Sequence, residues 1–127
     1  MRVRNRSPRT VRVLGAGAAL LLAVGCASEP PSASPDLPDG LGPPVAAPVV
    51  EVDDNVFVPE EVVVTAGTEV RWEWVGRAAH DVEGEGFASD IQVEGSFTHT
   101  FDAPGTFPYV CTLHPGMDGT VYVVPSG

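Results

Sequence analysis

The chain has 127 residues, enough for one small folded domain, and it is acidic: 17 Asp and Glu oppose 7 Arg, without any Lys. Five of the seven Arg lie within the first twelve positions, so only Arg71 and Arg77 accompany the acidic residues in the rest of the chain. Clustered Lys and Arg bind phosphate backbones, and their scarcity here argues against nucleic-acid binding. An acidic surface instead favours solubility and attraction to a basic protein partner.

Residues 1–25 have the pattern of an export signal. A basic stretch precedes the apolar run 13–24, whose twelve residues fall short of the roughly 20 that span a bilayer. The run ends at Cys26 in Ala-Val-Gly-Cys, which resembles the lipobox of bacterial and archaeal lipoproteins. The resemblance implies lipidation of Cys26 and a location on the outer face of the cytoplasmic membrane or in the periplasm. A soluble secreted protein is the alternative.

Residues 26–48 differ in composition from both of their neighbours. Seven Pro occur among Ser, Ala, Asp and Gly in this segment. Such a stretch cannot bury a core and favours extended, semi-rigid polyproline conformations. We therefore predict a tether that separates the export signal from a folded domain at 49–127.

From residue 49 onward the apolar residues follow a period of two. The clearest case is 70–74, where Val70, Trp72 and Trp74 fall on one face of a predicted strand and are expected to be core residues. Gly, Pro, Asp and Asn separate similar runs, and no stretch has a helical period. Short strands at this spacing predict an all-β antiparallel sandwich or barrel. The other runs are 49–52, 57–58, 62–65, 96–101, 106–111 and 120–124.

One short loop carries three metal-binding side chains. Cys111, His114 and Met117 follow directly after the predicted strand 106–111 and supply a thiolate, an imidazole and a thioether. Soft sulfur ligands with imidazole select copper, and two His with one Cys and a weak axial Met form the blue-copper site. This site needs a second His from elsewhere in the fold, and His80 is the natural candidate because it lies just past the Trp72/Trp74 strand.

The same residues also allow other interpretations. Cys and His also suit zinc, although a thioether adds little to a zinc site. A lone Cys beside a strand is often a small buried apolar residue. The presence of three further candidate ligands, His80, His114 and Met117, favours metal binding for Cys111. His99 lies on a predicted strand without a partner and is expected to be structural. A disulfide between Cys26 and Cys111 would require the tether to fold back, so we do not expect one.

A resemblance to a known family is carried by 70–74, 80–82, 101–111 and the loop that closes into 119–121. The region from about 50 to 124 resembles the cupredoxins, and most closely the plastocyanin, halocyanin and amicyanin group. The resemblance implies a Greek-key β-sandwich of two antiparallel sheets with eight strands. It also implies one type 1 copper ion, held by His80, Cys111, His114 and Met117, that cycles between Cu(II) and Cu(I). The acidic, lipoprotein-like design is similar to halocyanin, and the short gap between His114 and Met117 is similar to amicyanin.

Two residues beside the ligands depart from the family pattern. Asp81 stands where the family often has an Asn that ties the two ligand-bearing loops together, and Leu113 stands where Pro is common. An ionised Asp accepts hydrogen bonds but cannot donate them. Both changes leave the ligand set intact and affect the reduction potential, because neighbouring groups tune a metal. The resemblance further implies that His114 is the ligand nearest solvent, with Leu113, Pro115 and Gly116 forming an apolar rim where partners dock.

The sequence predicts an extracytoplasmic electron-transfer protein that acts as a monomer with redox protein partners. Multicopper enzymes need further histidines, and the chain has three in all, so we do not expect an enzyme. The alternative is an extracytoplasmic copper chaperone or scavenger, but such proteins use Met-rich or His-rich segments and this chain has only Met1 and Met117. An acidic cluster is either a solvated surface or a docking patch for a basic partner; it comprises Glu83, Glu85, Asp90 and Glu94.

Overall fold

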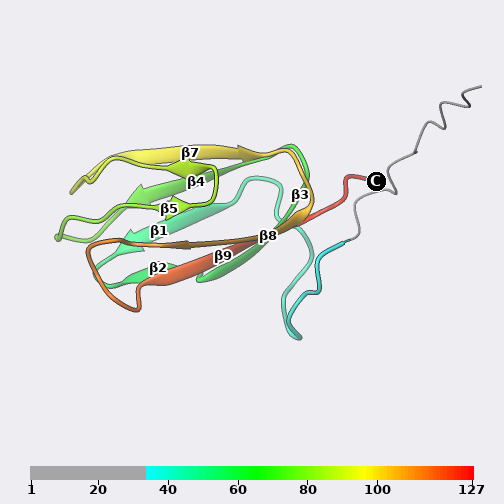
Figure 1. Cartoon of the computed structure of the whole chain (residues 1–127), viewed down its shortest axis with the longest axis horizontal. Coiled ribbons are helices and arrows are strands. Elements are labelled where there is room, and N and C mark those ends of the chain that lie inside the picture. The colour runs from blue at the N-terminus through cyan, green and yellow to red at the C-terminus, as the bar shows by residue number, and fades with distance from the viewer. Residues whose placement is uncertain (1–33) are drawn as a thin grey trace, which may run out of the picture.

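Nine strands form two sheets within residues 34–127, the part of the chain that the computed structural model describes (Figure 1). The first sheet has the order β2-β1-β4-β7 and the second has the order β3-β9-β8-β5-β6. The predicted all-β sandwich is confirmed. The strands are β1 (Val49–Asp53), β2 (Val56–Val58), β3 (Glu61–Thr65), β4 (Thr68–Trp74), β5 (Glu83–Gly84), β6 (Phe87–Ala88), β7 (Ser96–Phe101), β8 (Gly105–Val110) and β9 (Asp118–Val124).

Both sheets are mixed, which corrects the expectation that they are entirely antiparallel. β1 pairs with β4 in parallel, and β3 pairs with β9 in parallel. The reason is the path of the chain between the sheets. After β2 the chain crosses to the second sheet as β3, and the turn at Ala66 and Gly67 returns it to the first sheet as β4. Strands that are consecutive in sequence therefore do not always pair.

The core is centred on Trp72, as the alternating pattern of β4 predicts. Val70, Trp72 and Trp74 are all buried, whereas the residues between them are exposed. The Trp72 ring contacts Phe97 in its own sheet and Tyr109 in the facing sheet, with ring centroids 5.7 and 5.4 Å away. One aromatic side chain thus joins the two sheets. Burial raises the pKa of Tyr109 to about 12.

The end of the predicted tether packs against the sandwich. Residues 34–48 form no strand, but the Val45 amide donates a hydrogen bond of 2.8 Å to the Val63 carbonyl on the edge strand β3. Pro48 is buried, and its carbonyl accepts a hydrogen bond from the Arg71 amide. The contacts of the folded domain thus begin a few residues before β1.

Two predictions fall on residues that the structure does not describe. These are the export signal at 1–25 and lipidation of Cys26. In the described range, no helix is long and apolar enough to cross a membrane.

Candidate metal centre

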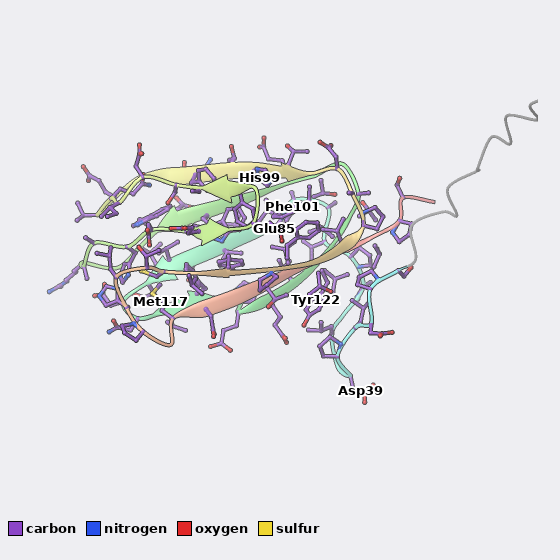
Figure 2. The ribbon with its side chains drawn as sticks, viewed as in Figure 1. Asp39, Glu85, His99, Phe101, Met117 and Tyr122 are labelled. Carbon is purple, nitrogen blue, oxygen red and sulfur yellow. The ribbon has the colours of Figure 1, made fainter. Side chains whose placement is uncertain are left out.

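Four connecting segments meet at one end of the sandwich. They are the β1–β2 turn, the segment 75–82 after β4, the segment 89–95 between β6 and β7, and the loop 111–117 between β8 and β9. Hydrogen bonds and close contacts join them, and all of these contacts converge on His80. Figure 2 shows Met117 at the same end, where the loop 111–117 leads into β9. Side chains far apart in sequence are thereby gathered in one place.

Three of the four predicted ligands bring their donor atoms together. The Cys111 Sγ lies 3.7 Å from the Nδ1 of His80 and 3.4 Å from the Nδ1 of His114. The two imidazole rings have centroids 4.5 Å apart. The donor atoms of the three residues all lie within 4.8 Å of one another. Each His thus turns the same ring nitrogen toward the sulfur, and the three atoms outline a site for one small ion.

The fourth predicted ligand, Met117, is held by the backbone of the loop 111–117. The Met117 carbonyl accepts a hydrogen bond of 2.9 Å from the Cys111 amide, and the Met117 amide donates one of 3.1 Å to the His114 carbonyl. Gly116 has a φ of 84°, a conformation that glycine adopts without strain and that lets the loop turn back. Cys111 and Met117 are both buried, whereas His114 is partly exposed. His114 is therefore the ligand candidate nearest to solvent, as the resemblance to cupredoxins implies.

His80 is fixed from its backbone outward. Its amide and carbonyl exchange two hydrogen bonds of 3.0 Å with the backbone of Gln92, and Trp74 Nε1 donates to its carbonyl at 3.2 Å. The side chain is fully buried. This surrounding structure restricts the His80 ring and keeps its Nδ1 directed at Cys111.

Asp81 joins the two ligand-bearing segments. Its carboxylate accepts a hydrogen bond of 2.7 Å from the Thr112 amide and one of 2.5 Å from the Thr112 hydroxyl. The bridge therefore runs from the neighbour of His80 to the neighbour of Cys111. A carboxylate that only accepts is sufficient for this role, because Thr112 supplies both donors.

Removing this bridge tests its contribution to stability. We expect Asp81→Ala to lower the free energy of unfolding by about 1.5–3 kcal/mol, the range for hydrogen bonds to a charged group. We expect Asp81→Asn to lose less, because its carbonyl oxygen still accepts from the Thr112 amide. Urea unfolding of the three proteins measures the difference. An Asp81→Ala protein as stable as the native one would show that the bridge does not hold the segments together.

Asp54 belongs to the site, although the sequence did not indicate it. Its Oδ1 lies 3.2 Å from Nε2 of His80 and accepts hydrogen bonds from the amides of Arg77 and Ala78 at 2.9 and 2.8 Å. The Ala78 amide, followed by the His80 ring and the Arg77 amide, holds the pKa of Asp54 below its ordinary value. The available signal was the position of Asp54 in a turn directly after a strand. This position indicates a contact with His80 only once β1 is known to lie parallel to β4, because the residues that follow the two strands then lie at the same end of the sheet.

The remaining residues singled out from the sequence are not among the clustered donors. His99 is on β7, stacked on Phe87 with ring centroids 4.8 Å apart, and is not part of the cluster around Cys111 (Figure 2). Its packing agrees with the structural role predicted for it. The acidic cluster Glu83, Glu85, Asp90 and Glu94 is exposed.

The donor set fits copper. A cysteine sulfur and two imidazole nitrogens face one another, and a buried thioether follows on the same loop. Zinc accepts the first three donors, but a thioether contributes little to a zinc site. Soft sulfur with imidazole is the combination that selects copper. These residues therefore suit one copper ion.

Comparisons with known proteins agree with this chemistry. No family model matches the chain. Amicyanin-alpha of Methylorubrum extorquens is 32% identical over 88 residues, which cover 63% of this chain and 74% of that protein. A purple cupredoxin from Nitrosopumilus maritimus shares the fold, with a TM-score of 0.57, 20% identity, and coverage of 60% of this chain and 98% of the other. Amicyanin from Paracoccus versutus has a TM-score of 0.56 at 30% identity, covering 63% and 83%.

The amicyanin sequences and the donor cluster point to the same family. The M. extorquens protein is matched over more than two thirds of its length, and the solved structures share the two-sheet fold. The chain belongs to the cupredoxins, the family of blue copper proteins.

Proposed function

We propose that this protein passes single electrons between redox proteins outside the cytoplasm, with one copper ion bound by His80, Cys111, His114 and Met117. The observation that carries the proposal is the convergence of the Cys111 sulfur and two imidazole Nδ1 atoms within 4.8 Å. Copper in such a site supplies one-electron chemistry between Cu(II) and Cu(I). Similarity to amicyanins supports an electron carrier rather than an enzyme.

The protein's own residues contribute to electron transfer by holding the proposed ligands in fixed positions. His80 is held by backbone bonds to Gln92, and the Cys111 and Met117 backbones are bonded to each other. Asp81 ties the segment of His80 to that of Cys111 through Thr112. A site with fixed ligands changes little when the charge on the ion changes, so little reorganisation opposes electron transfer.

Burial of the site argues against the alternative of a copper chaperone or scavenger. Cys111, Met117 and His80 are 4%, 2% and 0% exposed. A chaperone hands over its metal by ligand exchange, which requires the acceptor's ligands to reach the ion. In this protein only His114 among the four proposed ligands is partly exposed. An electron can pass through that edge, whereas the ion cannot leave without opening the loop.

A competition experiment separates these two functions. The Cu(I)-loaded protein is mixed with an inorganic one-electron oxidant in one arm and with a strong Cu(I) chelator in the other. We expect rapid oxidation with copper retained, and slow loss of copper to the chelator. Copper transfer faster than oxidation would contradict the electron carrier and support the chaperone.

The rim around His114 is the proposed docking face. Leu113 is 42% exposed, and Pro115 and Gly116 are exposed beside it. An apolar surface next to the most accessible ligand lets a partner exclude water and approach the site. The exposed acidic side chains Glu83, Glu85, Asp90 and Glu94 would attract a basic partner and raise the association rate.

We expect Leu113→Glu to slow electron self-exchange between two copies of the protein by about tenfold or more, the lower part of the range for interface variants. The reason is that each copy would present a new carboxylate to the other at the docking face. NMR line broadening in mixtures of the two oxidation states measures this rate. High salt is used so that the general repulsion between acidic chains is screened.

Val49→Glu is the matched control, because Val49 is 46% exposed and begins β1 at the opposite end of the sandwich. We expect both variants to keep the blue absorption band. An unchanged self-exchange rate in Leu113→Glu, or an equal loss in Val49→Glu, would show that transfer does not pass through this rim.

We also propose the arrangement of the whole chain: an export signal at 1–25, a tether at 26–48 and the copper domain at 49–127, with Cys26 lipidated. The support is the apolar run that ends at Cys26 and the Pro-rich composition that follows it. The protein would then work as a monomer on the outer face of the cytoplasmic membrane or in the periplasm. Mass spectrometry of the membrane-bound protein tests this, and a mature chain without a lipid on Cys26 would contradict it.

A further inference from the structure

One carboxylate oxygen of Asp54 collects three nitrogen partners from the segment that carries His80. The amides of Arg77 and Ala78 donate to its Oδ1 at 2.9 and 2.8 Å, and Nε2 of His80 lies 3.2 Å away. The His80 ring is fully buried, whereas the Asp54 side chain is 41% exposed. Asp54 therefore lies between solvent and the Nε2 atom of the His80 ring.

The fold builds this position for Asp54. β1 and β4 run parallel, with Val52 opposite Trp74, so the residues that follow the two strands emerge side by side. The Val52 carbonyl accepts from the amides of Val75 and Gly76 at 3.0 and 3.2 Å. Gly76 packs so closely that a Cβ there would collide with the Asp54 carboxylate. The end of β1 and the segment after β4 are thus held together, and this close packing places the Asp54 carboxylate next to the His80 ring.

These contacts determine which nitrogen of His80 carries a hydrogen. The Asp54 oxygen already accepts from two backbone amides, and a carboxylate acts only as an acceptor. Its contact with Nε2 therefore requires that Nε2 donates. A neutral imidazole has one N–H, so Nδ1 is left with a free lone pair. That lone pair lies on the side of the ring facing the Cys111 sulfur, 3.7 Å away.

We propose that Asp54 is a positioning residue for the copper site: it holds His80 as the Nε2–H tautomer and directs Nδ1 toward the metal. This inference rests on the proposed function, in which His80 is a ligand. Carboxylate partners of this kind orient metal-bound His and make the imidazole a stronger donor. A stronger donor favours Cu(II), so Asp54 also lowers the reduction potential.

Geometry is expected to matter more than charge at this position. Solvent reaches the Asp54 carboxylate, and water screens the effect of an exposed charge on its surroundings. An amide oxygen at the same place still accepts from the two backbone amides and from Nε2. Asp54→Asn is therefore expected to keep the tautomer and the copper affinity close to native. Asp54→Ala removes the acceptor, so this variant is expected to lose the Nε2–H tautomer and part of the copper affinity.

Two readouts test the proposal on the full-length protein. The first is copper affinity, measured by competition with a chelator, for which loss of such a partner typically costs about ten- to hundredfold. The second is nitrogen NMR of His80 in the copper-free protein, which detects the Nε2–H and its exchange with water. Asp90→Ala is the control, because it removes an exposed carboxylate from the same end of the molecule, in the segment that contacts His80 through Gln92.

We expect Asp54→Ala to lose affinity in this range, to exchange its Nε2–H faster and to have a higher reduction potential. Asp54→Asn and Asp90→Ala should keep native affinity and a protected Nε2–H. Native affinity and tautomer in Asp54→Ala would overturn the proposal. Should Asp54→Ala fail to fold, the native copper-free protein decides the question, because a His80 that carries its hydrogen on Nδ1 would overturn the proposal as well. A native protein that binds no copper, yet shows a protected Nε2–H, would instead refute the proposed function and leave the positioning role standing.

Discussion

Replacing Cys111 with Ser is expected to abolish the blue absorption band of the copper-loaded protein. The band arises from charge transfer between a cysteine thiolate and copper, and Cys111 is the one Cys among residues 34–127. Its sulfur lies 3.4 Å from Nδ1 of His114 and 3.7 Å from Nδ1 of His80, so it is the donor that both imidazoles face. A serine hydroxyl is similar in size but is a hard, protonated donor that suits Cu(I) poorly.

Visible absorption spectra during Cu(II) titration measure this effect. Thr112→Ser is the matched control, because it changes the adjacent residue by one methyl group and keeps the hydroxyl that bonds Asp81. We expect the control to retain the blue band at native intensity. A blue Cys111→Ser protein would show that the sulfur is not a ligand.

Replacing Trp72 with Ala is expected to have the largest effect on stability, about 3–5 kcal/mol of unfolding free energy. Trp72 is fully buried and its ring packs between the sheets against Phe87, Phe97, Phe101 and Tyr109. A small domain has only about 5–15 kcal/mol of net stability, so this loss threatens folding of the metal-free protein. Copper that binds the folded state more tightly than the unfolded chain should partly offset the loss by mass action.

Urea unfolding of metal-free and copper-loaded protein measures both effects. Val49→Ala is the control, because Val49 is an exposed strand residue and surface changes usually stay within about 0.5 kcal/mol. A loss below about 1 kcal/mol in Trp72→Ala would contradict a core centred on this side chain.

The features predicted from sequence are those that depend on local pattern. Alternation in β4 predicted the burial of Val70, Trp72 and Trp74, because side chains of a strand point to opposite faces in turn. The short spacing from Cys111 to Met117 predicted a single loop carrying three donors. His80 was found because it follows the strand that carries the central core residues.

The features that sequence did not predict depend on how distant segments pair. Parallel pairing of β1 with β4 leaves no trace in the apolar pattern, since either direction buries the same alternate residues. Asp54 acquires its role only through that pairing, which brings it to His80 across 26 residues of sequence. Asp81 was identified as a departure from the family, but its bonds to Thr112 show that it connects the ligand segments as an acceptor.

The most direct test of the central claim is a copper titration of the purified protein followed by redox cycling. We expect the blue band to grow until one Cu(II) ion is bound per chain, to disappear on one-electron reduction and to return on oxidation. The sulfur and imidazole atoms gathered within 4.8 Å predict this result. A protein that stays colourless with Cu(II), or that does not regain its colour on oxidation, would contradict the assignment of the site.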